Sequence, residues 1–115
     1  MNKYRDKSDF EINKAVAEEL KLNYEIDYSM RIVVIGEHII YNPCLNPSQA
    51  MPIIIENNIS LHAPIFSEGW MAEYTGSDED VNDGFQVDYF DAHNQNPYRA
   101  AMEVFLMMKD AENES

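Results

Sequence analysis

Apolar and polar positions near the N-terminus recur with the period of a helix. Ile12, Val16 and Leu20 follow one another every four residues, which places them on one face of a helix. Ser8 and Glu11 have the spacing of a capping box, in which each side chain satisfies a free backbone N–H of the first turn. The sequence therefore predicts a helix that begins just after Ser8 and packs one face on a sheet.

The next segments have the period of strands. Tyr or Ile alternates with Glu or Asp over residues 24–28, and 32–35 is a β-branched run. Gly36 and Glu37 separate that run from His38, Ile39, Ile40 and Tyr41. This pattern predicts two or three strands, the last two joined as a hairpin by a two-residue turn.

A second helix is predicted from a cap and a proline. Asn46 is a favourable N-cap, and Pro47 fits the first helical position, where its missing N–H is not needed. Pro52 removes one hydrogen bond inside the helix, so we expect the helix to kink there or to begin again near Ala50. Asn57 should end it.

The second half of the chain predicts three strands and a long buried helix. Residues 59–62, 70–75 and 85–90 are the strands, and 76–84 form an acidic hairpin loop between the last two. Asn96 and Pro97 repeat the cap-and-proline signal. The following residues, 98–109, are apolar on nearly every face, so this helix should be the most buried element.

The order of these elements predicts an α+β fold. Helices and strands do not alternate regularly as in a parallel sheet, so we expect a mainly antiparallel sheet packed with about three helices. A length of 115 residues corresponds to a single domain, 1–115, and the polar residues 110–115 should form a frayed acidic tail.

Negative charge is concentrated in one stretch of the chain. The net charge is −13, yet acidic and basic residues balance within the first 21 positions. Between residues 68 and 91 there is no Lys or Arg, and the carboxylates there are Glu68, Glu73, Asp78, Glu79, Asp80, Asp83, Asp88 and Asp91. Such a surface repels phosphate groups, which disfavours direct contact with nucleic acid or an anionic membrane.

Cysteine content and hydropathy indicate a reducing compartment. Cys44 is the single cysteine, so no disulfide within the chain is possible. The N-terminal residues lack the apolar stretch of a signal peptide, and no segment approaches the ~20 apolar residues of a membrane span. We expect a cytoplasmic protein.

The acidic segment 78–84 partly resembles a calcium-binding loop but departs from it in three ways. Its glycine, Gly84, comes one position late, and Tyr89 stands where a calcium loop has a bidentate Glu. The flanks are predicted strands rather than helices. A solvated hairpin loop is the better interpretation, and we expect no metal site.

No pattern of catalytic or cofactor-binding residues is present. His38, His62 and His93 lack zinc spacing on one element, and Cys44 lies in no nucleophile motif. Phosphate-binding glycine loops and a nucleophile elbow are missing too. We therefore expect no cofactor and assign no catalytic residue, although sequence alone leaves open whether distant side chains meet in space.

Aromatic residues close to the acidic stretch have two interpretations. They could form a stacking pocket for a base or sugar, or they could pack against a helix, which is the commoner role of strand aromatics. These residues are Trp70, Tyr74, Phe85, Tyr89 and Phe90.

Four segments together resemble the NinX family of small proteins of lambdoid tailed phages and prophages. They are SDFEIN (8–13), NPSQAMPII (46–54), GWMA (69–72) and NPYRAAMEVFLMM (96–108). The resemblance covers most of the chain in order and is weakest over residues 24–45. It implies a phage or prophage origin, expression in the cytoplasm of the bacterial host and an α-β-α sandwich, but it implies no activity and no site residues.

Arg99 stands out within the resemblance. It lies in the first turn of an apolar helix, where the helix dipole disfavours a cation, so it should have a carboxylate or carbonyl partner in a buried ion pair.

The leading functional hypothesis is a non-enzymatic, acidic accessory protein that binds a basic host or phage protein. A small-ligand protein that binds or sequesters a nucleotide-like molecule is the alternative, and an enzyme comes third. The partner's identity and the oligomeric state stay open. The expected contact residues are Glu68, Glu73, Asp78, Glu79, Asp80, Asp83 and Trp70.

Overall fold

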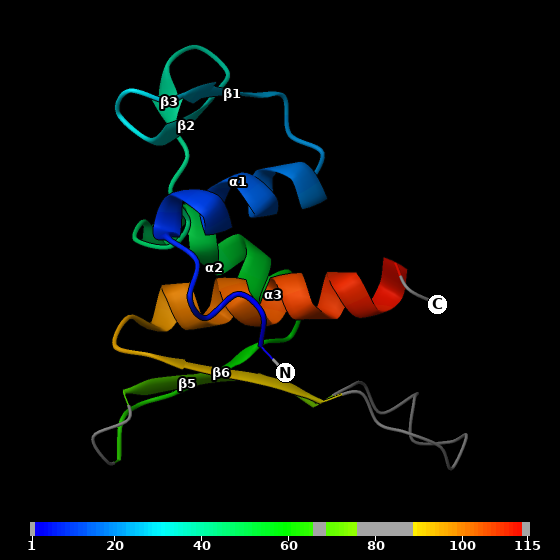
Figure 1. Cartoon of the computed structure of the whole chain (residues 1–115). Coiled ribbons are helices and arrows are strands. Elements are labelled where there is room, and N and C mark those ends of the chain that lie inside the picture. Colours follow the sequence, from blue (N-terminus) through cyan, green and yellow to red (C-terminus); the bar gives the residue numbers. More distant parts are fainter. Residues whose placement is uncertain (1, 66–68, 76–88, 114–115) are drawn as a thin grey trace.

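The computed structural model describes residues 2–65, 69–75 and 89–113 of the chain. Within these ranges it forms helices and strands in the order helix, three strands, helix, three strands, helix (Figure 1). The elements are α1 (Asp9–Glu19), β1 (Tyr24–Asp27), β2 (Ile32–Ile35), β3 (Ile39–Ile40), α2 (Pro47–Glu56), β4 (Ser60–His62), β5 (Trp70–Tyr74), β6 (Phe90–Asn94) and α3 (Pro97–Asn113).

The strands form two separate antiparallel sheets, with orders β1-β2-β3 and β4-β5-β6. Figure 1 shows the helices stacked between them, with α1 beneath the first sheet and α3 directly over the second. The α+β class and the antiparallel pairing are thus confirmed. The expected α-β-α sandwich is wrong, because among the described residues no helix covers the outer face of the second sheet. The side of β5 and β6 that faces α3 carries the buried Ala72 and Ala92, whereas the other side carries Glu73, Asp91 and His93, so only one face of this sheet favours burial.

Helix α1 begins where its sequence predicts. The Ser8 hydroxyl accepts from the Glu11 N–H at 3.2 Å, and the Glu11 carboxylate accepts from the Ser8 N–H at 3.4 Å, which completes the capping box. Ile12 and Val16 are buried, but Leu20 is exposed because it lies at the C-cap, after the last helical turn.

The hairpin between β2 and β3 has a longer turn than predicted. Ile35 pairs with Ile39, so three residues rather than two connect the strands. Gly36 and His38 both adopt positive φ, 56° and 68°, in this turn. A glycine adopts this conformation without strain, and the bend at His38 shortens β3 to two residues.

Helix α2 is continuous through Pro52, so of the two predicted alternatives, a kink or a new start near Ala50, the new start is wrong. The Asn46 side chain caps the helix by accepting from the Ser48 N–H at 3.0 Å, and Pro47 follows in the first turn. Pro52 leaves the Ser48 carbonyl without its helical donor. Both residues are exposed, so water can bind this carbonyl without ending the helix.

The second sheet begins as predicted and ends differently. Strands β4 and β5 fall within the expected segments, but β6 begins at Phe90, the last residue of the expected strand 85–90. Of that expected strand, 85–88 lie outside the described residues, as does the expected loop 76–84. The Ala72 to Ala92 pairing under α3 explains the register, since two alanines leave room for a helix to lie close to the sheet.

Helix α3 is the centre of the core, as its sequence predicts. The Asn96 side chain caps it by accepting from the Tyr98 N–H at 2.8 Å. Its buried residues are Arg99, Ala100, Ala101, Met102, Glu103, Val104, Phe105, Leu106 and Met108. The helix runs on to Asn113, and Asp110 accepts a hydrogen bond from the Tyr4 hydroxyl, so residues 110–113 are helical rather than a frayed tail. Residues 114–115 lie outside the described part.

Candidate functional site

The outer face of the second sheet carries two rows of side chains, all polar except Met71. Cross-strand partners point to the same face of a sheet, and the register aligns Ser60 with Glu73 and Glu73 with Asp91. The alternate positions, Leu61, Ala72 and Ala92, face α3. We call the outer surface the open face, and it consists of Ser60, His62, Met71, Glu73, Asp91 and His93.

Short contacts link the side chains of the open face. His62 Nε2 lies 3.1 Å from Glu73 Oε1, and the Tyr89 hydroxyl donates to Glu73 Oε2 at 3.2 Å. His93 Nδ1 lies 4.0 Å from Asp91 Oδ2. Partial desolvation, together with the charges of Asp91 and Glu73, raises the pKa of Tyr89 above its usual value. Strands β4, β5 and β6 contain no Lys or Arg, so two carboxylates here have no cationic neighbour on their own sheet.

The structure does not bring the expected contact residues together on one described surface. Glu73 lies on the open face, whereas Trp70 alternates with Met71 and lies on the helix side of β5, half-buried. Glu68 and the loop carboxylates lie outside the described residues; the latter are Asp78, Glu79, Asp80 and Asp83. The sequence did not place His62 and His93 beside Glu73 and Asp91, because that neighbourhood depends on strand register.

The described aromatic residues do not gather into one pocket. Tyr74 and Phe90 stack on the helix side with ring centroids 6.5 Å apart and an interplanar angle of 24°. Trp70 lies at the opposite end of β5, and Phe85 is outside the described residues. Packing against a helix therefore describes Tyr74 and Phe90 better than a stacking pocket does.

Arg99 is at the centre of a buried polar cluster. Its Nε donates to Glu103 Oε2 at 2.7 Å, and its Nη1 donates to Asp9 Oδ1 at 2.7 Å. Its Nη2 donates to the Tyr4 carbonyl at 2.9 Å and to the Lys7 carbonyl at 2.7 Å. The side chains of Arg99 and Glu103 are 7% and 0% exposed. The sequence led us to expect a carboxylate or carbonyl partner, and Arg99 contacts both kinds.

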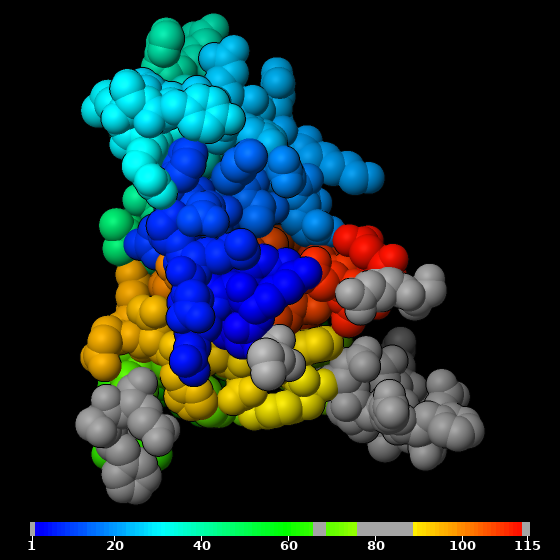
Figure 2. Space-filling model, in the orientation of Figure 1, coloured from blue at the N-terminus to red at the C-terminus, as the bar shows by residue number. Residues whose placement is uncertain are grey.

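This cluster joins the N-terminus to the core helix. Burial lowers the pKa of Arg99, but the hydrogen bonds that it donates to Asp9 and Glu103 outweigh that effect and raise the pKa, so the guanidinium stays charged. Because each guanidinium nitrogen donates to a protein oxygen, Arg99 holds the segment before α1 against α3 (Figure 2). Its donors serve the fold and are not available to a ligand.

Cys44 is part of a second buried polar cluster, which the sequence did not predict. The Cys44 N–H donates to Asn13 Oδ1 at 3.2 Å, and Asn96 Nδ2 donates to the Cys44 carbonyl at 2.8 Å. Burial, then the nearby charge of Asp9, raises the pKa of the Cys44 thiol far above its usual value. A protonated, fully buried thiol is a poor nucleophile.

The described residues offer little to a metal ion or a small molecule. No three His, Cys, Asp or Glu side chains among them lie close enough to share a metal ion. His38 lines an open hollow of about 380 Å³ beside the first sheet, with Glu25 and Tyr28. Another hollow, of about 330 Å³, lies between the ends of α2 and α3 beside Tyr74 and Phe90. None of the described helices has the length and hydrophobicity to cross a lipid bilayer.

Comparison with known proteins gives one match. The family model described as bacteriophage P22 NinX matches residues 3–109. No curated protein and no solved structure matches the chain significantly. The matched range includes the Arg99 cluster, the Cys44 cluster and the whole of the second sheet.

Proposed function

Since the chain belongs to the NinX family of bacteriophage P22, we propose that this phage protein is a non-enzymatic accessory protein that binds a basic host or phage protein. The contact surface is the open face together with the acidic stretch 68–91. The partner is a protein, and electrostatic attraction brings it to this surface.

The open face carries this proposal. It is a flat sheet surface left uncovered by the described helices, and it displays Glu73 and Asp91 on strands without Lys or Arg. The chain that joins β5 to β6 adds further carboxylates next to it in sequence, with no cation between them. A surface of one charge sign attracts partners of the opposite sign and speeds their association.

The alternative hypotheses have less support. Nucleotide-like ligands need a cation or a cradle of N–H groups, and the donors of Arg99 are taken up by protein oxygens. Covalent catalysis needs an activated nucleophile, and the Cys44 thiol is buried and protonated. Protein binding requires neither.

A salt-dependent binding experiment tests the proposal. The tagged protein captures its partner from host or phage-infected lysate, and association rates are then measured for the purified pair at low and high salt. We expect the rate to fall as salt rises, because the screening length shortens to ~8 Å at physiological ionic strength. Combining Asp78→Asn, Glu79→Gln, Asp80→Asn and Asp83→Asn should slow association at low salt.

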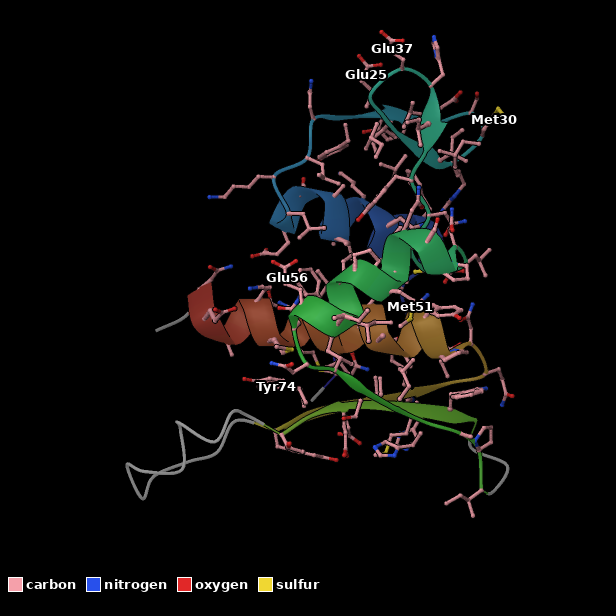
Figure 3. All side chains as sticks on the ribbon, turned by 180° about the vertical axis from the view of Figure 1, so that it is seen from behind. Glu25, Met30, Glu37, Met51, Glu56 and Tyr74 are labelled. Carbon is pink, nitrogen blue, oxygen red and sulfur yellow. The ribbon has the colours of Figure 1, made fainter. Side chains whose placement is uncertain are left out.

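The control variant removes the same number of charges elsewhere. Asp6→Asn, Glu18→Gln, Glu25→Gln and Glu37→Gln change exposed carboxylates outside the open face and the acidic stretch; two of them, Glu25 and Glu37, lie at the first sheet in Figure 3. This variant should associate at close to the unmodified rate. Equal rates and equal salt dependence for both variants would show that the acidic loop is ordinary surface, and the search would then move to Trp70.

A further inference from the structure

Strand β4 is an edge of the second sheet. Within the described residues, β5 is its only sheet neighbour, so alternate N–H and C=O groups of Ser60–His62 point away from the sheet. The strand is also fixed in place, because the Ile59 N–H donates to the Ile54 carbonyl of α2 at 3.0 Å. An edge that is both unpaired and fixed can accept a further strand.

An apolar groove runs beside this edge. It is an open hollow of about 520 Å³ between α2 and β4. Figure 3 shows α2 in front of α3 and labels Met51, which lines this hollow. Ile55 lies in this groove and is 68% exposed to solvent. The groove is lined by Met51, Ile54, Ile55, Asn58, Ile59, Ser60 and Leu61. A helix alongside an unpaired strand edge is the geometry that binds extended peptides by strand addition.

The two faces of the sheet determine what such a peptide should look like. Leu61 faces α3, so a strand added beside it would direct alternate side chains towards Ile55 and the groove. The remaining side chains would extend the open face, next to Ser60 and in the row that continues to Glu73 and Asp91. The groove favours apolar residues, and the carboxylates favour Lys or Arg.

Charge repulsion disfavours a second copy of this chain as the occupant of the groove. Each copy carries a net charge of −13, and pairing two β4 edges would bring two acidic open faces into one continuous sheet. A basic segment instead gains attraction beside Ser60, in the row that continues to Glu73 and Asp91.

We propose that the groove between α2 and β4 binds an extended segment of a basic protein, which adds to the sheet beside β4 with alternate apolar side chains in the groove and alternate Lys or Arg side chains on the open face. This inference rests on the proposed function, since it names how the basic partner is held.

A designed peptide tests the inference by NMR. The probe is a capped seven-residue peptide of alternating Lys and Val, compared with its Glu and Val counterpart and with a version N-methylated at alternate backbone nitrogens. We expect the Lys peptide to shift the amide signals of residues 58–62, 51 and 53–55 and to give amide contacts with β4. The Glu peptide should bind at least about tenfold more weakly, and so should the N-methylated peptide, which lacks the donors for strand addition.

Two matched variants locate the contact. Ile55→Gln removes an exposed apolar side chain from the groove, and Ile39→Gln removes one of similar exposure, 53%, from the other sheet. Both keep the net charge. We expect about tenfold weaker binding for Ile55→Gln, the loss typical of a central contact residue, and unchanged binding for Ile39→Gln.

The possible outcomes separate this inference from the proposed function. Shifts confined to Glu73, Asp91 and the acidic stretch would overturn strand addition while leaving a basic partner in place. Absence of any shift at millimolar Lys peptide would overturn strand addition as well, and the salt experiment would then decide the proposed function separately. A dimer in sedimentation that Ile55→Gln dissociates would show that a second copy occupies the groove instead.

Discussion

At the residue scale, Arg99 and Glu103 form a buried ion pair, and each charge is stabilised by the other. Arg99→Met would leave the Glu103 carboxylate, which is fully buried, without its cation. Such a change costs about 3–5 kcal/mol of unfolding free energy. Arg99→Met combined with Glu103→Leu should recover part of the loss, because no buried charge is left unpaired. Urea unfolding of the parent, Arg99→Met, Glu103→Leu and the double variant measures the coupling; an Arg99→Met variant within about 1 kcal/mol of the parent would contradict the assigned role.

Gly69 is required by both its conformation and its surroundings. It adopts φ of 89°, and a Cβ atom there would lie 2.7 Å from the Asn94 carbonyl oxygen. We expect Gly69→Ala to cost about 1–3 kcal/mol, since the backbone must shift to relieve the contact. Gly36 is the control, because its φ is 56° but the nearest atom to an added Cβ is 3.9 Å away. Gly36→Ala should cost about 1 kcal/mol. Equal losses in thermal unfolding would show that the contact with Asn94 is unimportant.

Tyr41 should make the protein sensitive to alkali. Its side chain is 5% exposed, and burial, with a smaller contribution from Cys44, raises its pKa from 10.0 to about 12. The folded state therefore holds this proton more tightly than the unfolded chain. Stability is complete below pH 10 and is lost as pH rises towards the folded pKa. Between neutral pH and pH 11, the unfolding free energy of the parent should fall by about 1 kcal/mol more than that of Tyr41→Phe.

Urea unfolding at a series of alkaline pH values measures this difference. Tyr28→Phe is the control, because Tyr28 is exposed in the turn after β1 and its replacement removes the same hydroxyl without touching the core. If both variants followed the parent curve, burial of Tyr41 would not explain the alkaline loss.

At the element scale, α3 is the helix on which the other elements pack. Phe105 is fully buried between this helix and its neighbours, so Phe105→Ala removes both buried area and packing. We expect a loss of about 3–5 kcal/mol. Met107 on the same helix is only partly buried, and Met107→Ala should cost clearly less. An unchanged melting temperature for Phe105→Ala would contradict the assignment of α3 as the central core helix.

The whole molecule carries a charge excess that should make its stability depend on salt. With a net charge of −13, the folded state is destabilised by repulsion among carboxylates, which salt screens. We expect the melting temperature to rise as NaCl increases towards physiological strength. CaCl₂ at matched ionic strength should give the same curve, and micromolar zinc should change nothing, because we expect no specific metal site. A calcium-specific rise would point to the acidic loop.

The sequence alone determined the features that depend on neighbouring residues. Ser8 with Glu11, Asn46 with Pro47 and the apolar run of α3 act over one or two helical turns, so their effects can be predicted from spacing. The family could also be identified from ordered local segments, and the family match over residues 3–109 confirms it.

Only the tertiary structure decided the features that depend on distant residues. Strand β6 was set by the pairing of Ala92 with Ala72 beneath α3, not by the alternation around Tyr89. Arg99 was predicted to need a partner, but its contact with Asp9 spans 90 positions of the chain and required the fold. The groove beside β4 likewise exists because α2 and the sheet edge meet in space. Local spacing determines where helices with caps begin, whereas strand limits, register and packing are decided together when the whole core is buried.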